Sequence, residues 1–396
     1  MPETGSRPNE RAWDDIIDLA VDLRHDLHRR PELTWSENLT AKTIRDRLTA
    51  ADIPWRACAD TGTVARLAPN AKGRHIALRG DIDALPLTEQ SGVDWSSEHE
   101  GCMHACGHDG HTATLMGTAL WLKSHEESLP GPVTLLFQPA EEGGHGAKRM
   151  IEDGALEAVD AIFGWHNWPA IPYGKAVCPD GAVMSANGTF AITVKGKGGH
   201  ASQPELCRDP VLAGSAITLA LQQVVSRRLA PQQAVVVSVT SIDARSSDTI
   251  IPETARIGGS FRLSDNGLRK TVEDLITACA EDTARSYGVT AEVEMRPRYS
   301  ATVNHAAEAE IYRKALSDEF GPDWRSEETM VPIMASEDFS YYLAEIPGAF
   351  ALIGADDGKG HDAPCHSTHY DFNDALIPHL TRVYARLAGA PLPDTP

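Results

Sequence analysis

Residues 111–139, HTATLMGTALWLKSHEESLPGPVTLLFQP, decide the fold, because a helical pattern is followed at once by a fully apolar strand. The pattern predicts a helix over 111–125 and a buried strand over 132–139. Three further strand patterns lie outward along the chain, at TVARL (63–67), HIALRG (75–80) and AIFGWHN (161–167). Strands separated by helices of this length form crossover units, so we predict an α/β domain with helices on both faces of its sheet.

A different order of elements follows, namely strand, helix, strand, strand, helix, strand. Its patterns are TFAITVKGKG (189–198), DPVLAGSAITLALQQVVSRRL (209–229), AVVVSVTSI (234–242), ARIGGSFRL (255–263), GLRKTVEDLITACAEDTARSY (267–287) and TAEVEMRP (290–297). This order is that of a ferredoxin-like fold. The last patterns, a helix at 305–320, a strand at 348–355 and a helix at 371–389, are predicted to return to the first sheet. We therefore predict a discontinuous domain, residues 1–185 and 299–396, with a second domain, residues 186–298, inserted in it.

The excess of acidic residues argues against some classes of binding partner. Lys and Arg number 36 against 56 Asp and Glu, a net charge of −20. This field repels nucleic-acid phosphates and anionic membranes, so we expect neither as a partner. No apolar run reaches the ~20 residues that cross a bilayer, and the N-terminal residues show a helical apolar pattern rather than that of a signal peptide. With seven cysteines, an odd number without a disulfide framework, the chain is predicted to be cytoplasmic.

Side chains that can bind metal follow the predicted strands. They are Asp81 and Asp83 in RGDIDALPL (79–87), Cys106 and His108 in MHACGHDGH (103–111), Glu141 and Glu142 in FQPAEEGG (137–144), His166 in GWHNWP (164–169), and His366 and His369 in APCHSTHYDFND (363–374). Loops at strand ends bring distant parts of a chain to one point. Thiolate and imidazole donors together favour zinc or another borderline transition metal over magnesium or calcium.

Each stretch alone also has a structural explanation. Asp81 and Asp83 fit a polar strand end, the two glutamates fit a helix start where acids are favourable, and His166 fits a core histidine. Taken together, however, the sulfur, nitrogen and carboxylate donors match a site around two ions. Adjacent glutamates point in different directions, so one can bind metal while the other acts as a base, as a hydrolytic site requires. A structural zinc would more often use paired CxxC motifs, which the sequence lacks.

In order and spacing these motifs resemble the aminoacylase/amidohydrolase branch of the co-catalytic metallopeptidases, which includes hippurate hydrolases, auxin-conjugate hydrolases and N-acetyl-diaminopimelate deacetylases. The resemblance covers nearly the whole chain and adds GKGGHAS, the DP of RDPV and SEDFSYY. It implies a mixed-sheet zinc-peptidase-like catalytic domain with an inserted ferredoxin-like lid and dimerisation domain. The most specific motifs are MHACGHDGH and QPAEE.

The resemblance also implies roles for single residues. Its metal ligands map onto Cys106, His108, Glu142, His166 and His366, with the Cys106 thiolate bridging two ions. Glu141 becomes the general base and later the general acid, and Asp83 orients a ligand histidine. His200 matches a residue that stabilises the oxyanion, often across a dimer interface.

Activity and cofactors follow from the same resemblance. We expect hydrolysis of the amide bond of small N-acyl amino acids, most of all N-acetyl ones, giving a carboxylate and a free amino acid. Two divalent ions are expected as cofactors: thiolate softness favours zinc, related enzymes often use manganese or cobalt, and nickel stays open. A homodimer through the inserted domain is expected.

Two departures from the family pattern concern the substrate. Where relatives have a second histidine shortly after the GGH segment, this chain has Glu205 in PELCRDP, and an asparagine expected before IP is missing from SSDTIIPE (246–253). If Glu205 faces the pocket, it favours a cationic side chain, such as that of an N-acetylated diamino acid. A surface glutamate is the alternative, and an unchanged substrate preference in Glu205→His would support it.

Other functions compete with this hypothesis. A dipeptidase or carboxypeptidase on the same site differs only in what the pocket accepts on the acyl side. A non-catalytic metal-binding protein is disfavoured by Glu141, which such a protein could lose without losing metal. Thiol redox catalysis at Cys106 is disfavoured because no CxxC partner is present.

Overall fold

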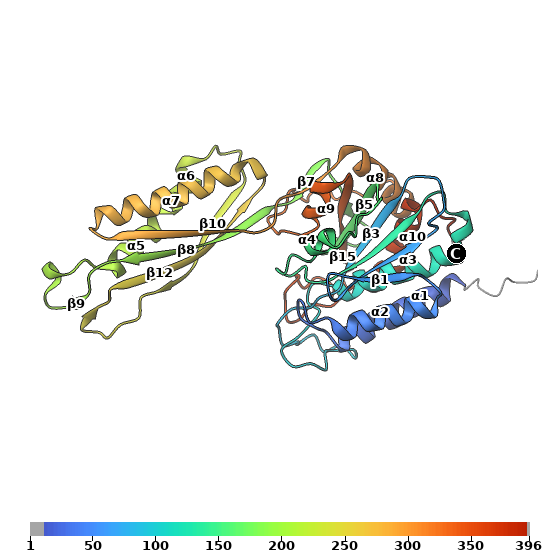
Figure 1. Cartoon of the computed structure of the whole chain (residues 1–396), viewed down its shortest axis with the longest axis horizontal. Coiled ribbons are helices and arrows are strands. Elements are labelled where there is room, and N and C mark those ends of the chain that lie inside the picture. The colour runs from blue at the N-terminus through green and yellow to red at the C-terminus, as the bar shows by residue number, and fades with distance from the viewer. Residues whose placement is uncertain (1–11, 394–396) are drawn as a thin grey trace, which may run out of the picture. The chain divides into compact units, whose positions relative to one another are not determined.

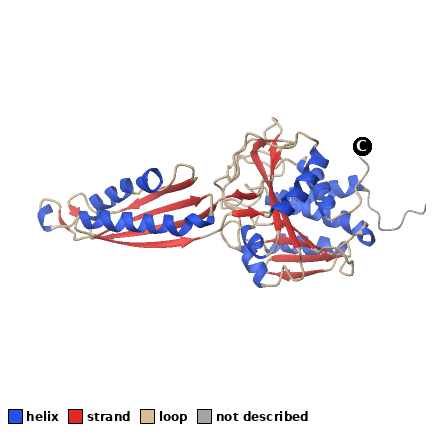
Figure 2. Cartoon of the chain, turned by 90° about the horizontal axis from the view of Figure 1, so that it is seen from above, coloured by secondary structure: helices blue, strands red, loops and turns tan. Residues whose placement is uncertain are grey.

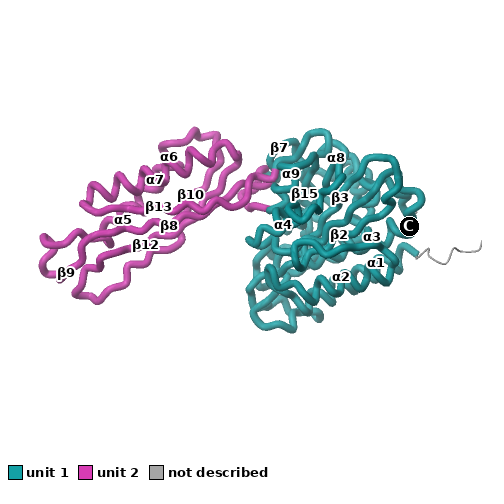
Figure 3. Tube along the Cα trace, viewed as in Figure 1, with its two compact units in different colours: residues 1–183, 303–330, 338–396 teal, residues 184–302, 331–337 magenta. Residues whose placement is uncertain are grey.

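The computed structural model describes residues 12–393, which form two compact units (Figure 3). The first unit extends to Val183 and includes Val303–Met330 and the chain from Asp338 onward. The second holds Met184–Thr302 and Val331–Glu337. Residues 331–337, which the sequence pattern places with the first domain, thus group with the second unit. Each unit has a separate apolar core.

The first unit is built on a mixed seven-stranded sheet (Figure 1). In spatial order its strands are β1 (Trp55–Cys58), β2 (Gly62–Leu67), β4 (Val133–Gln138), β3 (Ile76–Asp81), β5 (Ala161–Pro172), β15 (Gly348–Asp356) and β6 (Ala176–Val177). The four strands β4, β3, β5 and β15 are mutually parallel, and the others pair antiparallel. The predicted α/β class is confirmed, and the tail strand does return to the first sheet.

Helices cover both faces of this sheet, as strands and helices coloured separately show (Figure 2). They are α1 (Trp13–Arg29), α2 (Asn38–Ala50), α3 (His108–Ser124), α4 (Gly146–Glu152), α8 (Ala306–Phe320), α9 (Ser340–Glu345) and α10 (Leu376–Leu387). Gly80 in β3 faces the main chain of α3 at His111, where a Cβ would lie only 2.8 Å from the carbonyl oxygen. Gly164 in β5 faces the ring of Phe339, just before α9. Every residue of β3 and β4 is buried, as expected for strands covered on both sides.

The second unit is built on a four-stranded antiparallel sheet in the order β10 (Val235–Asp243), β12 (Thr254–Leu263), β8 (Ala186–Lys195) and β13 (Thr290–Pro297). The helices are α5 (Pro210–Ala220), α6 (Gln222–Arg228) and α7 (Arg269–Ser286). Asp209 caps α5, since its Oδ1 accepts from the backbone N–H of Val211 at 2.8 Å. The sequence pattern predicted a single helix over 209–229, whereas the structure has two helices there, α5 and α6. A short pair, β9 (Gly199–His200) and β11 (Ile250–Ile251), lies outside the main sheet.

Remaining short elements include β7 (Gly181–Met184) and β14 (Thr302–Asn304), which pair with each other. Among the described residues, no helix combines the length and the apolar character needed to cross a membrane.

A buried ion network ties α1 to the start of α3. The Arg24 Nε lies 3.0 Å from the Asp109 Oδ2, and both side chains are fully buried. His28 Nδ1 contacts the same oxygen at 2.8 Å, and Arg24 Nη2 donates to Asp371 Oδ1 at 2.5 Å. Although burial opposes it, Arg24 and His28 hold the pKa of Asp109 well below its usual range. The network thus fixes the helix turn that carries His108.

We expect Arg24→Ala to lower the free energy of unfolding by about 3–5 kcal/mol, because it leaves the Asp109 carboxylate buried without its main partner. Urea unfolding of the metal-free chain measures this effect. Lys42→Ala is the control, because its ion pair with Asp46 is solvent-exposed and should be worth less than about 1 kcal/mol. Equal effects of the two substitutions would contradict a structural role for the buried pair.

Candidate metal centre

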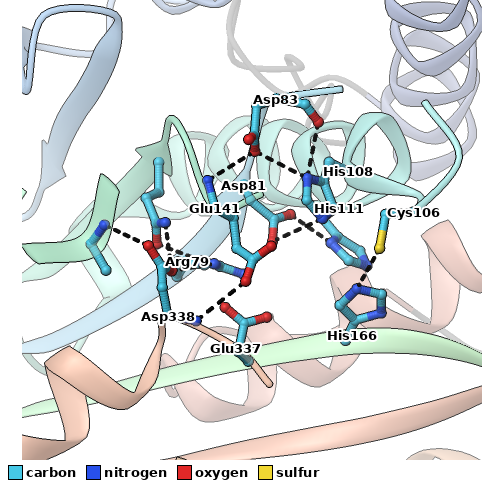
Figure 4. A network of polar contacts seen from close by, with 12 residues as sticks. Arg79, Asp81, Asp83, Cys106, His108, His111, Glu141, His166, Glu337 and Asp338 are labelled. Atoms are coloured by element: carbon cyan, nitrogen blue, oxygen red, sulfur yellow. Dashed lines mark hydrogen bonds and ion pairs between the residues drawn. The ribbon is translucent and has the colours of Figure 1, made fainter. Parts of the chain in front are cut away.

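The predicted ligands lie near the ends of the parallel strands of the first unit, and Figure 4 shows Cys106, His108 and His166 among them. Asp81 ends β3, Glu141 and Glu142 follow the end of β4, and Cys106 lies two residues before His108, which begins α3. His166 was expected at a strand end, but it lies inside β5, beyond the part of β5 that pairs with β3. The loop before α10 adds His366. The carboxyl ends of parallel strands are where α/β proteins commonly place their sites.

Two groups of three metal-competent side chains share one sulfur atom. Cys106, His108 and His166 form the first group, and Cys106, Glu142 and His366 form the second, with ligand atoms within 4.8 Å of one another in each. The Cys106 Sγ lies 3.3 Å from the Nε2 of His166 and 3.3 Å from that of His366. The His366 Nε2 lies 3.2 Å from the Glu142 Oε1. The Cys106 sulfur is therefore the atom that the two groups have in common.

The hydrogen bonds of the histidines leave the correct nitrogen for a metal. His108 Nδ1 donates to the main-chain oxygen of Asp83 at 2.9 Å, and His166 Nδ1 donates to that of Asn167 at 2.6 Å. Each Nε2 is therefore the ring nitrogen left to bind a metal, which it does as a neutral imidazole. Among the described residues, the buried His108 Nε2 and Glu142 Oε1 have no hydrogen-bond partner. These buried atoms without a hydrogen bond, together with the donor set, fit two divalent cations.

The electrostatics of the site also favour cations. Burial alone would lower the pKa of His108, yet Asp81 and Asp83 raise it to about 10. Burial and the nearby His111 and His108 hold the pKa of His166 well below its usual range, so that ring is neutral and can bind metal. Excess negative charge at His108 is what a bound cation would neutralise.

Asp83 holds the ligand histidine and the glutamate loop together. Its Oδ1 lies 3.2 Å from His108 Nδ1 and accepts from the backbone N–H of Glu141 at 3.1 Å. Its Oδ2 accepts from the backbone N–H of Glu142 at 3.0 Å and from the hydroxyl of Thr34 at 2.9 Å. Although burial opposes it, these bonds hold the pKa of Asp83 below its usual value. Asp83 contacts the predicted ligand His108 directly, and Thr34 is a partner that the sequence analysis missed.

We expect Asp83→Asn to weaken metal binding by about 10–100-fold, because an amide NH₂ would meet backbone N–H donors and could no longer hold the His108 tautomer. Titration of the metal-free protein with Zn²⁺ or Mn²⁺ against a chelator measures the affinity. Asp160→Asn is a matched control, since Asp160 accepts a backbone N–H from His75 at 2.8 Å at the other end of β3. Unchanged affinity in Asp83→Asn would overturn the role of Asp83.

Glu141 lies beside the ligands but outside both groups that contain Cys106. It is 6% exposed, and its Oε1 accepts from the backbone N–H of Asp338 at 3.3 Å. The Asp338 carboxylate in turn accepts from the Gln138 side chain at 2.8 Å and from the Ala147 N–H at 2.9 Å. The sequence motif SEDFSYY was recognised, but this contact with Glu141 was not predicted.

Asp81 and His111 form a hydrogen-bonded pair next to the predicted ligands. Asp81 is bonded to the guanidinium of Arg79 and accepts from His111 Nδ1 at 2.6 Å. His111 Nε2 accepts from the backbone N–H of Asn167 at 3.2 Å. These two metal-competent side chains therefore already have partners, and they brace the segment that follows His166.

The remaining candidates lie elsewhere. His369 is exposed and its Nδ1 contacts the main-chain oxygen of Gln90, so it does not join the cluster. His200 is exposed on β9 in the second unit, where its Nδ1 accepts from the hydroxyl of Ser202 at 2.8 Å. Glu205 is exposed in the same unit, in the short 3-10 turn Pro204–Leu206. The roles expected of His200 and Glu205 stay predictions.

Several known proteins are similar in sequence to this chain along nearly its full length. IAA-amino acid hydrolase ILR1-like 2 of Arabidopsis thaliana is 38% identical, with 94% of this chain and 85% of that protein covered. N-acetyl-L-cysteine deacetylase of Bacillus subtilis is 37% identical, covering 89% and 88%. Hippurate hydrolase of Campylobacter jejuni is 36% identical, covering 94% and 97%.

A solved structure is also similar to this chain. A dinuclear metal binding peptidase of the M20 family from Bacillus subtilis superposes with a TM-score of 0.81 at 31% identity, covering 95% of this chain and 98% of that one. The sequence pattern of peptidase family M20/M25/M40 matches residues 77–390, which include all five predicted ligands. The chain therefore belongs to peptidase family M20/M25/M40 and is a hydrolase of the amidohydrolase kind.

Proposed function

We propose that this hydrolase cleaves the amide bond of small N-acyl amino acids, releasing a carboxylate and a free amino acid. The observation that carries the proposal is the pair of ligand groups sharing the Cys106 sulfur, with Glu141 beside them. The names of the relatives support the substrate class, since an IAA-amino acid, N-acetyl-L-cysteine and hippurate each join an acyl group to an amino acid through an amide.

The ligands we assign to two divalent ions, zinc or manganese, are Cys106, His108, Glu142, His166 and His366. When bound, such ions supply Lewis-acid chemistry, lowering the pKa of water and polarising a carbonyl. Glu141 takes the proton from the attacking water and gives it to the leaving amine. Asp83 supports both tasks, because its carboxylate binds the backbone of the glutamate loop and the ring of His108.

We further propose that the second unit acts as the lid and dimerisation domain, with His200 stabilising the oxyanion. Its strand order β10-β12-β8-β13 is that of a ferredoxin-like sheet. The edge strand β10 carries the exposed apolar side chains of Val236 and Ile242, and α5 those of Leu212 and Leu219. Exposed strand edges and apolar surface patches of this kind are commonly covered by another subunit in a protein assembly. Leu219→Glu, followed by light scattering, tests the homodimer: it should shift the chain to the monomer mass.

The test of the proposed function is amine release from a panel of N-acetyl, N-benzoyl and N-indoleacetyl amino acids, including N-acetylated diamino acids. Metal-loaded wild type should release amine from at least one class, and apoprotein from none. Dipeptides belong in the same panel. If dipeptides alone were cleaved, the chain would be a dipeptidase and the N-acyl proposal would fail.

A further inference from the structure

A second cysteine lies next to the shared thiol of the metal centre. Cys365 directly precedes the ligand His366, whose backbone N–H donates to the main-chain oxygen of Ala105 at 2.7 Å. This bond sets residues 105–106 and 365–366 side by side. The Cys365 sulfur also lies 3.9 Å from the side-chain nitrogen of Asn167, the residue after His166. Cys365 and Cys106 therefore lie on adjoining backbone segments, each next to residues of the metal centre.

The two cysteines lie on adjoining backbone segments. The hydrogen bond from His366 to Ala105 joins the immediate chain neighbours of Cys365 and Cys106, and a disulfide spans a Cα separation of about 4.4–6.8 Å. No cysteine of the described chain is in a disulfide in this structure. Cys106 is buried, whereas Cys365 is half-buried and the adjacent His366 side chain is 54% exposed. A small oxidant can therefore reach the pair from the loop side.

We propose that Cys106 and Cys365 are a peroxide-sensitive modification site, in which a reversible disulfide removes the Cys106 thiolate from both ligand groups. The inference rests on the proposed role of Cys106 as the shared ligand. No assigned role of the centre uses Cys365, so the second thiol is available as the resolving partner.

The chemistry balances with hydrogen peroxide as the named oxidant. Cys106 is a thiolate when it binds metal, and in that form its sulfur attacks one peroxide oxygen, the O–O bond breaks, and Cys106 sulfenic acid and hydroxide form. The Cys365 sulfur then attacks the sulfenic sulfur, the S–O bond breaks, and water leaves as the S–S bond forms. Two thiols lose two hydrogen atoms in total, and peroxide becomes two waters. A dithiol reductant reverses the step.

Cys365 also determines what happens on stronger oxidation. Without a neighbouring thiol, a sulfenic acid proceeds to sulfinic acid, which reductants do not repair. With Cys365 present, the disulfide traps the repairable state. The wild type should therefore lose metal on treatment with peroxide and rebind it after reduction, whereas Cys365→Ser should lose metal irreversibly.

The experiment treats the metal-loaded full chain with hydrogen peroxide and follows three readouts: metal release to a chromogenic chelator, mass spectrometry of peptides, and recovery after dithiothreitol and metal. We expect a peptide linking residues 106 and 365 in the wild type, lighter by two hydrogen atoms than its two parts. Cys279→Ser, which removes a half-buried thiol of α7, is the matched control and should behave as the wild type.

The outcomes separate the inference from the function on which it rests. Sulfinic acid at Cys106 with no linked peptide in the wild type, or equal recovery of wild type and Cys365→Ser, would overturn the disulfide. An untreated enzyme that holds two metals and hydrolyses N-acyl amino acids in that same experiment would keep the proposed function. A linked peptide without any metal release would show that Cys106 is not the shared ligand.

Discussion

Glu141→Gln is expected to lower kcat/KM for a cleaved N-acyl amino acid by about 10²–10⁴-fold, the usual contribution of a general base. Glutamine keeps the size of the side chain and accepts from the Asp338 N–H as glutamate does, at the 3.3 Å contact. It cannot take a proton from water at neutral pH. The change therefore removes the chemistry of the base and leaves the local packing intact.

The control for this prediction is the neighbouring Glu142→Gln. Glu142 belongs to the group with Cys106 and His366, and its Oε1 is 3.2 Å from the His366 Nε2. We expect this variant to lose metal as well as activity, whereas Glu141→Gln keeps both ions by elemental analysis. If Glu141→Gln also lost an ion, Glu141 would be a ligand and the base would have to be sought elsewhere.

The sequence predicts the elements of the first unit well, because buried strands and helices have strong apolar patterns. The strand expected over 132–139 is β4, and the helix expected over 111–125 is α3, which begins earlier, at His108. Helix α2 was not predicted, since its apolar residues are few. The assignment of 331–337 to the second unit depends on packing, which no local pattern reveals.

The sequence also predicts one part of the candidate site, the ligands, better than the other part, the residues that orient them. Motifs identify the five proposed ligands because their donor types are rare and stand close together in short stretches, and the structure brings all five into two adjoining groups. The partners that orient them were harder to predict. Thr34 acts through a hydrogen bond across the fold, from its hydroxyl to Asp83, and nothing in its neighbourhood of sequence marks it. Asn167 stands in the GWHNWP motif, but its contacts with the rings of His111 and His166 are made by its main chain, so its side-chain type does not reveal them.

The Cys106 sulfur belongs to both ligand groups, so removing it tests whether the two groups form one metal centre. Cys106→Ala removes a ligand from both groups, whereas His366→Ala removes a ligand from only one of them. We therefore expect Cys106→Ala to retain almost no metal after desalting, and His366→Ala to retain about one ion of the two that a co-catalytic site holds. Both variants should be inactive on N-acyl amino acids.

Loss of a buried thiol by itself could also disturb the protein, so Cys178→Ala serves as the control. Cys178 is 4% exposed, lies in the same unit and belongs to none of the metal-competent groups of the described chain. It should keep two ions, because a smaller side chain there removes packing contacts and the hydrogen bond from the Asn304 side chain at 3.8 Å but no ligand. Two retained ions in Cys106→Ala would mean that the groups do not share their sulfur. One ion in both Cys106→Ala and His366→Ala would place Cys106 on a single metal, and the disulfide with Cys365 would then release one ion instead of two.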